Sequence, residues 1–145
     1  MKILVEYIII GDEFPVQEVS EAIGIKDCEI VKTGDVVYYG ENNKGYRVET
    51  DTSITYTTGY IDTIDMRLPV DIMTDMLSEK KNIIKYYIEK YSLESKFWIT
   101  LCLSDNPIMM MSERFIKLAA DLNAFVEFDT YLDYDEDERV ILNAT

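Results

Sequence analysis

Carboxylates are the most abundant side chains in this sequence that could do chemistry, because it contains 28 acidic residues and no histidine. Histidine is the usual general base and the commonest metal ligand, so Ser-His-Asp and Cys-His catalysis and His-ligated zinc or iron sites are excluded. A carboxylate pair could still act as general acid and base where burial raises one pKa. Four carboxylates lie in or beside predicted strands: Asp62, Asp65, Glu127 and Asp129. Among so many acidic residues, we expect these four to face water.

An acidic run, Asp133-Tyr134-Asp135-Glu136-Asp137-Glu138, resembles the start of a calcium-binding loop. The glycine required at position six is Glu138, and the bidentate glutamate expected at position twelve is Ala144. We therefore interpret residues 133–145 as a flexible, solvated acidic segment and expect no metal site there. The sequence contains no glycine-rich phosphate loop or dinucleotide fingerprint, so we expect no cofactor.

Lysines are concentrated in one part of this acidic chain: Lys80, Lys81, Lys85, Lys90 and Lys96. Such a cluster could hold an anion in a small-ligand sensor. We favour a polar helix face in which Lys85 and Glu89 pair at i, i+4 spacing.

Tyrosine is frequent, with 11 residues, and several lie in the predicted β region: Tyr38, Tyr39, Tyr46, Tyr56 and Tyr60. Tyrosine is enriched at binding surfaces, but it also packs across strands, so both interpretations stay open. As contacts for a protein partner the sequence suggests Asp133, Asp135, Asp137, Tyr38, Tyr39 and Tyr60.

The formal net charge of −14 limits the classes of partner. It disfavours nucleic acid and anionic membranes, which are bound through lysine and arginine, and it favours a basic protein. We do not expect residues 2–10 to form a signal peptide, because Glu6 interrupts the apolar run and no small-residue cleavage site follows. Cys28 and Cys102 are far apart in the sequence and are expected to be reduced, buried thiols. We expect a cytoplasmic protein, and the sequence leaves its oligomeric state open.

Hydrophobic periodicity predicts a single domain over residues 1–145 with an α+β fold, in which helices pack against a mostly antiparallel sheet as a two-layer sandwich. Strands are expected at 3–10, 25–32, 36–39, 46–56, 60–68, 96–103 and 124–132, and helices at 15–23, 69–91 and 112–122. Residues 3–10 are apolar on both alternating faces, which indicates a central strand covered on both sides. Thr58-Gly59 is expected to turn the chain, with a bend at residues 51–53 as the alternative. Trp98 and Met109–Met111 are interpreted as core residues.

These elements contain short motifs in a characteristic order. They are Gly11-Asp12 after the first strand, Pro15, Val19-Ser20, Ile23-Gly24-Ile25, Lys32-Thr33-Gly34-Asp35, Ser112-Glu113, Leu118-Ala119, Asn123-Ala124 and Asp129-Thr130-Tyr131. With them the sequence resembles the mainly bacterial family named domain of unknown function 4279. The resemblance implies an α+β fold and supplies no activity or catalytic residues.

Two classes of function follow from these features. A non-catalytic protein-binding module of the immunity or antitoxin type would use its negative charge and exposed tyrosines to cover a basic, toxin-like protein. The alternative is a His-independent enzyme or a small-ligand-binding protein with a pocket between the sheet and the helices. Two close carboxylates with shifted pKa values in such a pocket would favour the alternative.

Overall fold

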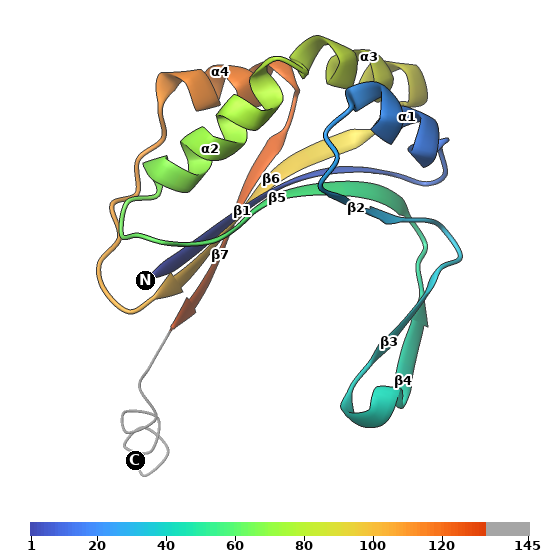
Figure 1. Ribbon diagram of the computed structural model, residues 1–145, viewed down its shortest axis with the longest axis horizontal. Coiled ribbons are helices and arrows are strands. Elements are labelled where there is room, and N and C mark those ends of the chain that lie inside the picture. Colours follow the sequence, from blue (N-terminus) through green and yellow to red (C-terminus); the bar gives the residue numbers. More distant parts are fainter. Residues whose placement is uncertain (133–145) are drawn as a thin grey trace.

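Two layers make up residues 1–132, the part of the chain that the computed structural model describes (Figure 1). The strands are β1 (Lys2–Gly11), β2 (Cys28–Val31), β3 (Val36–Tyr39), β4 (Gly45–Val48), β5 (Thr52–Asp62), β6 (Glu94–Leu103) and β7 (Phe125–Leu132). The helices are α1 (Val16–Ile23), α2 (Arg67–Ser78), α3 (Lys81–Tyr91) and α4 (Glu113–Asp121), with a short 3-10 turn η1 (Glu41–Asn43). All four helices lie on the same face of a five-stranded sheet of order β2-β5-β1-β6-β7. The predicted α+β fold is confirmed, and the sheet is mixed because β6 and β7 run parallel.

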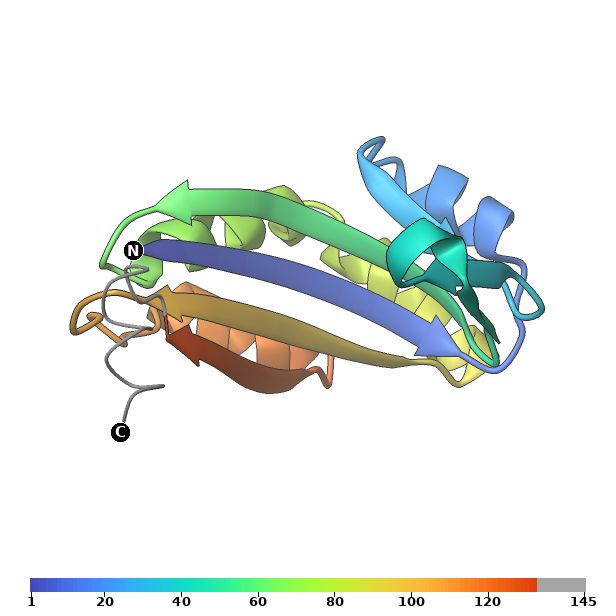
Figure 2. The ribbon, with the colours of Figure 1, turned by 90° about the horizontal axis from the view of Figure 1, so that it is seen from below.

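β1 is the central strand, as its apolar sequence predicts, and pairs antiparallel with β5 and β6. Its odd-numbered residues Ile3, Val5, Tyr7 and Ile9 are buried against the helices. The prediction that the strand is covered on both sides is wrong. Its even-numbered residues from Leu4 to Ile10 are only half-buried, because they lie on the face without helices (Figure 2).

Helix ends follow the local sequence closely. α1 ends at Gly24, which adopts the left-handed conformation with φ 76° that glycine tolerates. α4 is capped by Ser112, whose hydroxyl accepts a hydrogen bond from the Phe115 amide, and Asn123 follows with φ 49°. All three residues coincide with ends of the helices predicted over 15–23 and 112–122.

The long helix predicted over 69–91 is in fact two helices, α2 and α3, separated at Glu79–Lys80. Residues 78–82 are all polar, so this stretch has no apolar side chain to bury against the sheet. The hydroxyls of Thr74 and Ser78 also donate to the carbonyls of Val70 and Thr74, at 2.9 and 2.6 Å. Such hydrogen bonds within a helix favour bending, which explains the break.

The segment 46–68 also differs from its prediction. The chain leaves the five-stranded sheet after β2 and forms the separate β3–β4 hairpin, which contains Tyr46 and Val48. It re-enters the sheet at Thr52, as the alternative bend at 51–53 proposed. At Thr58-Gly59 the strand continues instead of turning. The register with β1 shifts between Leu4 and Glu6, which places an extra residue in β5 as a β-bulge.

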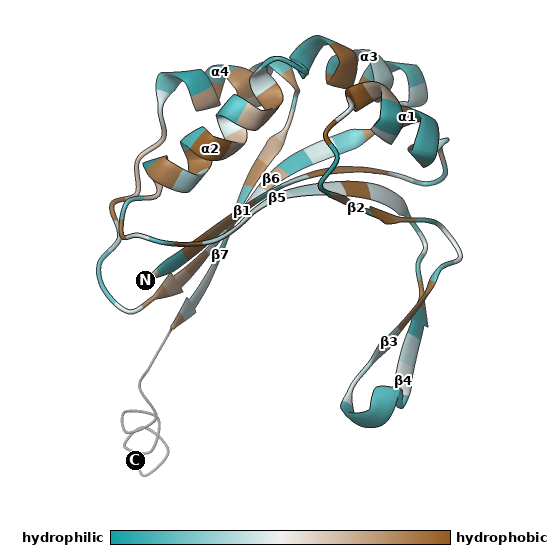
Figure 3. Cartoon of the chain, in the orientation of Figure 1, coloured by the Kyte–Doolittle hydropathy of each residue, from teal (hydrophilic) through white to brown (hydrophobic). Residues whose placement is uncertain are grey.

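The hairpin projects from one end of the sheet, away from the helix layer, so that hairpin and sheet form an arch (Figure 1). Figure 3 shows that the turn between its strands is hydrophilic, whereas β3 is partly apolar. Met109, Met110 and Met111 are 38–54% exposed, and Trp98 is half-buried on the helix-free face, so the core positions predicted for them are wrong. Cys28 and Cys102 are free thiols that are only half-buried, so the burial predicted for them is wrong as well. Within residues 1–132 no helix has both the length and the apolar character needed to cross a bilayer.

Candidate functional site

The helix-free face of the sheet, called the open face below, is the candidate site (Figure 2). It consists of the side chains that alternate away from the helices in four long strands and one short one. They are Glu29, Val31, Ser53, Thr55, Thr57, Tyr60, Asp62, Lys2, Leu4, Glu6, Ile8, Ile10, Glu94, Lys96, Trp98, Thr100, Cys102, Phe125, Glu127, Asp129 and Tyr131. Carboxylates outnumber ammonium groups on this face, and aromatic rings lie between them.

A row of side chains crosses the middle of the open face. Glu6 of β1 is in register with Thr57 of β5 and Trp98 of β6, and Trp98 is in register with Glu127 of β7. Partial burial raises the pKa of the Glu6 carboxyl, and the negative charge of Glu29 raises it further. Both carboxylates line a surface depression of about 320 Å³.

Trp98 already lies beneath a cation on this face. The Lys96 ammonium is 4.9 Å from the centre of the Trp98 ring, and it forms an ion pair of 3.4 Å with Glu127. A cation held by an aromatic face and a carboxylate is an arrangement that lysine or arginine of another protein can also adopt. The open face therefore has the chemistry for basic side chains.

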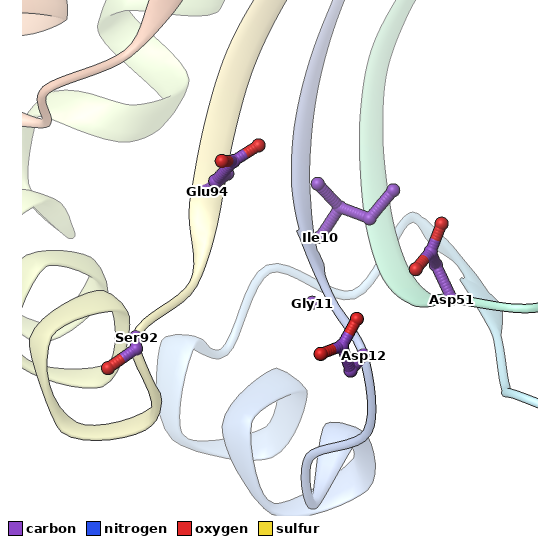
Figure 4. Close-up of a pocket in the computed structure, with 6 residues that line it drawn as sticks. All are labelled: Ile10, Gly11, Asp12, Asp51, Ser92 and Glu94. Carbon is purple, nitrogen blue, oxygen red and sulfur yellow. The ribbon is translucent and has the colours of Figure 1, made fainter.

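A second depression, of about 290 Å³, lies where β1 ends, near the base of the hairpin (Figure 4). Asp12, Asp51 and Glu94 extend toward it from three different segments, around Ile10. Within the described residues 1–132, no group of three or more carboxylate, thiol or imidazole side chains could hold a metal ion. Carboxylates spread around an open depression suit an extended cationic side chain better than a compact metal ion.

Tyrosines lie at the opposite end of the open face. The bulge in β5 reverses the alternation, so Tyr60 lies opposite Leu4 on the open face, although Tyr56 of the same strand is buried. The bulge is stabilised by Thr58, whose hydroxyl accepts a hydrogen bond of 3.1 Å from the Val5 amide. Tyr131 donates a hydrogen bond of 2.8 Å to Asp129, which raises the pKa of its phenol.

The hairpin carries a separate group of apolar side chains. Tyr38 lies opposite Tyr46, and Val36 lies opposite Val48, so these four residues share one face of the hairpin. They are 47–66% exposed, and Tyr39 on the other face is 56% exposed and packs over Gly45.

The predicted partner contacts are therefore only partly brought together. Tyr38 and Tyr39 lie on the hairpin, whereas Tyr60 lies at the far end of β5, and all three are exposed. The predicted contacts Asp133, Asp135 and Asp137, and the acidic segment 133–145 with its calcium-like run, lie outside the described residues.

The four candidate carboxylates do not converge on one catalytic pair. Asp65 binds the Arg67 guanidinium at 2.7 Å, and this hydrogen-bonded pair lowers its pKa. Asp62 lies near the N-terminal amine, while Glu127 and Asp129 share the open face of β7.

The lysines are also dispersed. Lys81 pairs with Asp121 at 2.9 Å, and Lys90 lies over the ring of Tyr91 at 5.3 Å. The predicted pair between Lys85 and Glu89 is not among the ion pairs formed within residues 1–132.

Sequence reasoning missed three residues of the open face as site residues: Glu6, Glu94 and Trp98. A signal for Glu6 was present, because it is the single charged residue within the apolar stretch from Ile3 to Ile10. A carboxylate in such a strand must reach solvent through an uncovered face.

Comparison with known proteins gives one positive result. The family model described as domain of unknown function (DUF4279) matches residues 1–133 of the chain. No curated protein and no solved structure matches the chain significantly.

Proposed function

Because the chain belongs to the DUF4279 family, we propose a function from its surface: a non-catalytic protein-binding module of the immunity or antitoxin type that covers a basic, toxin-like protein. The observation that carries this proposal is the open face of the sheet. It combines carboxylates with exposed or half-buried aromatic rings over a broad surface that the helices leave free.

Electrostatics supports a basic partner. The net charge is −14, and Glu6, Glu29, Glu94, Glu127 and Asp129 all lie on the open face. Such a field raises the rate of association with a basic protein by about ten- to a thousandfold at low salt. The gain shrinks as salt shortens the Debye length to about 8 Å at physiological ionic strength.

Aromatic side chains support specific recognition beyond charge. Tyrosine and tryptophan supply large contact areas with little conformational entropy, and they dominate the binding energy of many interfaces. Trp98 lies at the centre of the open face, while Tyr60 and Tyr131 lie at one end. At the other end, the hairpin exposes Tyr38 on one of its faces and Tyr39 on the other, and it extends the surface available to a partner seated under the arch.

The test is capture of partners from lysate of the native host with wild-type protein and two variants. Glu94→Lys reverses a charge on the open face, and Glu79→Lys makes the same change at the end of α2, in the helix layer. We expect a stoichiometric basic protein that wild type and Glu79→Lys retain at physiological salt and that Glu94→Lys loses. Expression of the captured protein alone should then arrest growth, and co-expression of the wild-type chain should restore it.

Three results would contradict the proposal. Capture that yields no basic protein would remove its basis, and so would a captured protein that binds both variants equally. A captured protein that is harmless when expressed alone would remove the immunity or antitoxin role.

A His-independent enzyme is the alternative function. The sequence predicts its pocket between the sheet and the helices, whereas the observation that favours an enzyme, the raised pKa of Glu6 beside Glu29, lies on the open face. In such an enzyme Glu6 would be the candidate general acid, and Glu29 would be the second carboxylate beside it. A thermal-shift screen of small metabolites tests it. A compound that stabilises wild type but not Glu6→Gln would support this alternative, and no response across the screen would oppose it.

A further inference from the structure

The two edges of the five-stranded sheet are protected very differently. One edge is β2, which has four residues, whereas the other is β7, which has eight. Natural proteins blunt exposed edges with short strands, charged side chains and above all lysine, proline or bulges, and the two charged residues of β7, Glu127 and Asp129, both lie on the open face. β7 contains neither lysine nor proline, its register with β6 is continuous, and its outer edge has no partner strand within residues 1–132.

β7 also exposes apolar side chains on both of its faces. Phe125 and Tyr131 lie on the open face and are 62% and 55% exposed. Phe128 lies on the helix side, in register with the buried Ile99, yet it is still 44% exposed. A strand added beside β7 would pair the backbone groups of this edge and bring its own side chains next to these apolar ones.

We propose that β7 binds an extended, basic segment of the partner as an added sixth strand of the sheet. This inference rests on the proposed function and names the docking mode and the partner segment. The alternation of β7 defines the sequence of the segment. Arginine or lysine would face Glu127 and Asp129 on the open face, and the residues between them would be apolar and pack beside Phe128 on the helix side.

Charge determines the choice of occupant. Glu127 and Asp129 lie on the edge strand, and the sequence that follows it, residues 133–138, contains five further acidic residues. A second copy of this chain fits the edge poorly. In an antiparallel pair with Phe128 opposite its own copy, Glu127 would lie opposite Asp129 of the other copy, and two chains of charge −14 would meet.

The experiment uses the full chain and two synthetic peptides of equal composition. In the first, arginine and valine alternate over the length of β7, and in the second all arginines precede all valines. Fluorescence anisotropy at physiological salt measures both affinities, and amide hydrogen exchange locates the contact. We expect the alternating peptide to bind at least tenfold more tightly. We also expect its binding to lower, at least tenfold, the hydrogen-exchange rate of those β7 amides that exchange fast in the free protein.

Matched variants separate edge pairing from general attraction. Glu127→Lys on β7 and Glu29→Lys on the opposite edge reverse one charge each on the open face. In Glu127→Lys an attractive cross-strand charge pair becomes a repulsive one, so the affinity for the alternating peptide should fall about two- to thirtyfold. In Glu29→Lys this affinity should change less than about twofold.

Four results would overturn the inference. They are equal binding of the two peptides, equal weakening by the two variants, unchanged exchange in β7 at saturation, and no binding of the alternating peptide. None of these results alters the outcome of the lysate capture, which decides the proposed function separately. Loss of the basic partner with Glu94→Lys together with unchanged exchange in β7 would keep the proposed function and reject the edge.

Discussion

Replacing Tyr56 by phenylalanine should stabilise the protein, because the Tyr56 hydroxyl is buried without a hydrogen-bond partner in the described structure. The side chain is 0% exposed, and its ring lies parallel to that of Tyr7, with 6.5 Å between the ring centres. Burial raises the pKa of the Tyr56 phenol, and the neighbouring Cys28 and Tyr7 raise it further. The raised pKa reflects the same apolar environment that disfavours the hydroxyl.

The magnitude follows from the cost of desolvating a hydroxyl. An unsatisfied buried polar group costs about 1–3 kcal/mol, and phenylalanine preserves the ring packing while removing the group. Cys28 lies in register with Tyr56 and its thiol is weakly polar, so we expect the lower end, a gain of about 1 kcal/mol in the free energy of unfolding. For a chain of this size the melting temperature should rise by about 2–4 °C.

Urea denaturation measures this gain, with the denaturant slope as an internal check that the unfolding reaction is unchanged. Tyr46→Phe is the matched control, because Tyr46 is 66% exposed and its change should fall within about 0.5 kcal/mol of zero. A loss of about 1 kcal/mol or more in Tyr56→Phe would refute the reasoning. The hydroxyl would then have a polar partner between the sheet and the helices, where the alternative function places a small ligand.

Three further predictions concern single side chains. Burial raises the folded-state pKa of Glu6 above its unfolded value, so its protonated form stabilises the fold at low pH and this contribution is lost as the pH rises through the folded pKa. Glu6→Gln should therefore melt at a higher temperature than wild type at about pH 7 and at the same temperature below about pH 4. A difference in melting temperature that stays constant across this pH range would contradict the prediction. Ser112→Ala should lower the free energy of unfolding in urea by about 1 kcal/mol, because the hydroxyl caps Phe115 at 3.3 Å and donates to Asp71 at 2.8 Å; an unchanged midpoint would count against the cap. Trp98→Ala should lower the affinity for the captured basic protein at least tenfold in a binding titration, while the circular dichroism spectrum stays unchanged. An affinity equal to that of wild type would show that Trp98 is not part of the binding surface.

Local chemistry made part of this fold predictable from the sequence. The apolar run of residues 3–10 predicted a central strand, and Gly24, Ser112 and Asn123 marked helix ends because capping depends on one or two residues. The break between α2 and α3 was missed because its apolar stripe resumes at Ile83 in nearly the same phase. The polar stretch between the two helices was the available signal.

The candidate site was harder to predict, because it depends on which face of the sheet is left uncovered. The sequence of a strand that is apolar on both faces does not indicate whether helices cover one side or both. Neither Glu6 nor Trp98 was therefore recognised as a site residue. The bulge at Thr58-Gly59 could not be predicted from alternation either. Simple alternation would place Tyr60 on the same face as Tyr56, but the extra residue moves Tyr60 to the opposite face.

The composition of the open face is itself an argument for a binding role. An antiparallel sheet that merely faces water alternates apolar core residues with polar outer residues. On β1 the outer positions are instead Leu4, Glu6, Ile8 and Ile10, and they remain half-buried without a covering layer. Apolar side chains at these positions gain little in the isolated molecule, because part of their surface stays in water. Their burial would be completed by a partner under the arch, and the surrounding carboxylates would restrict that partner to a basic one.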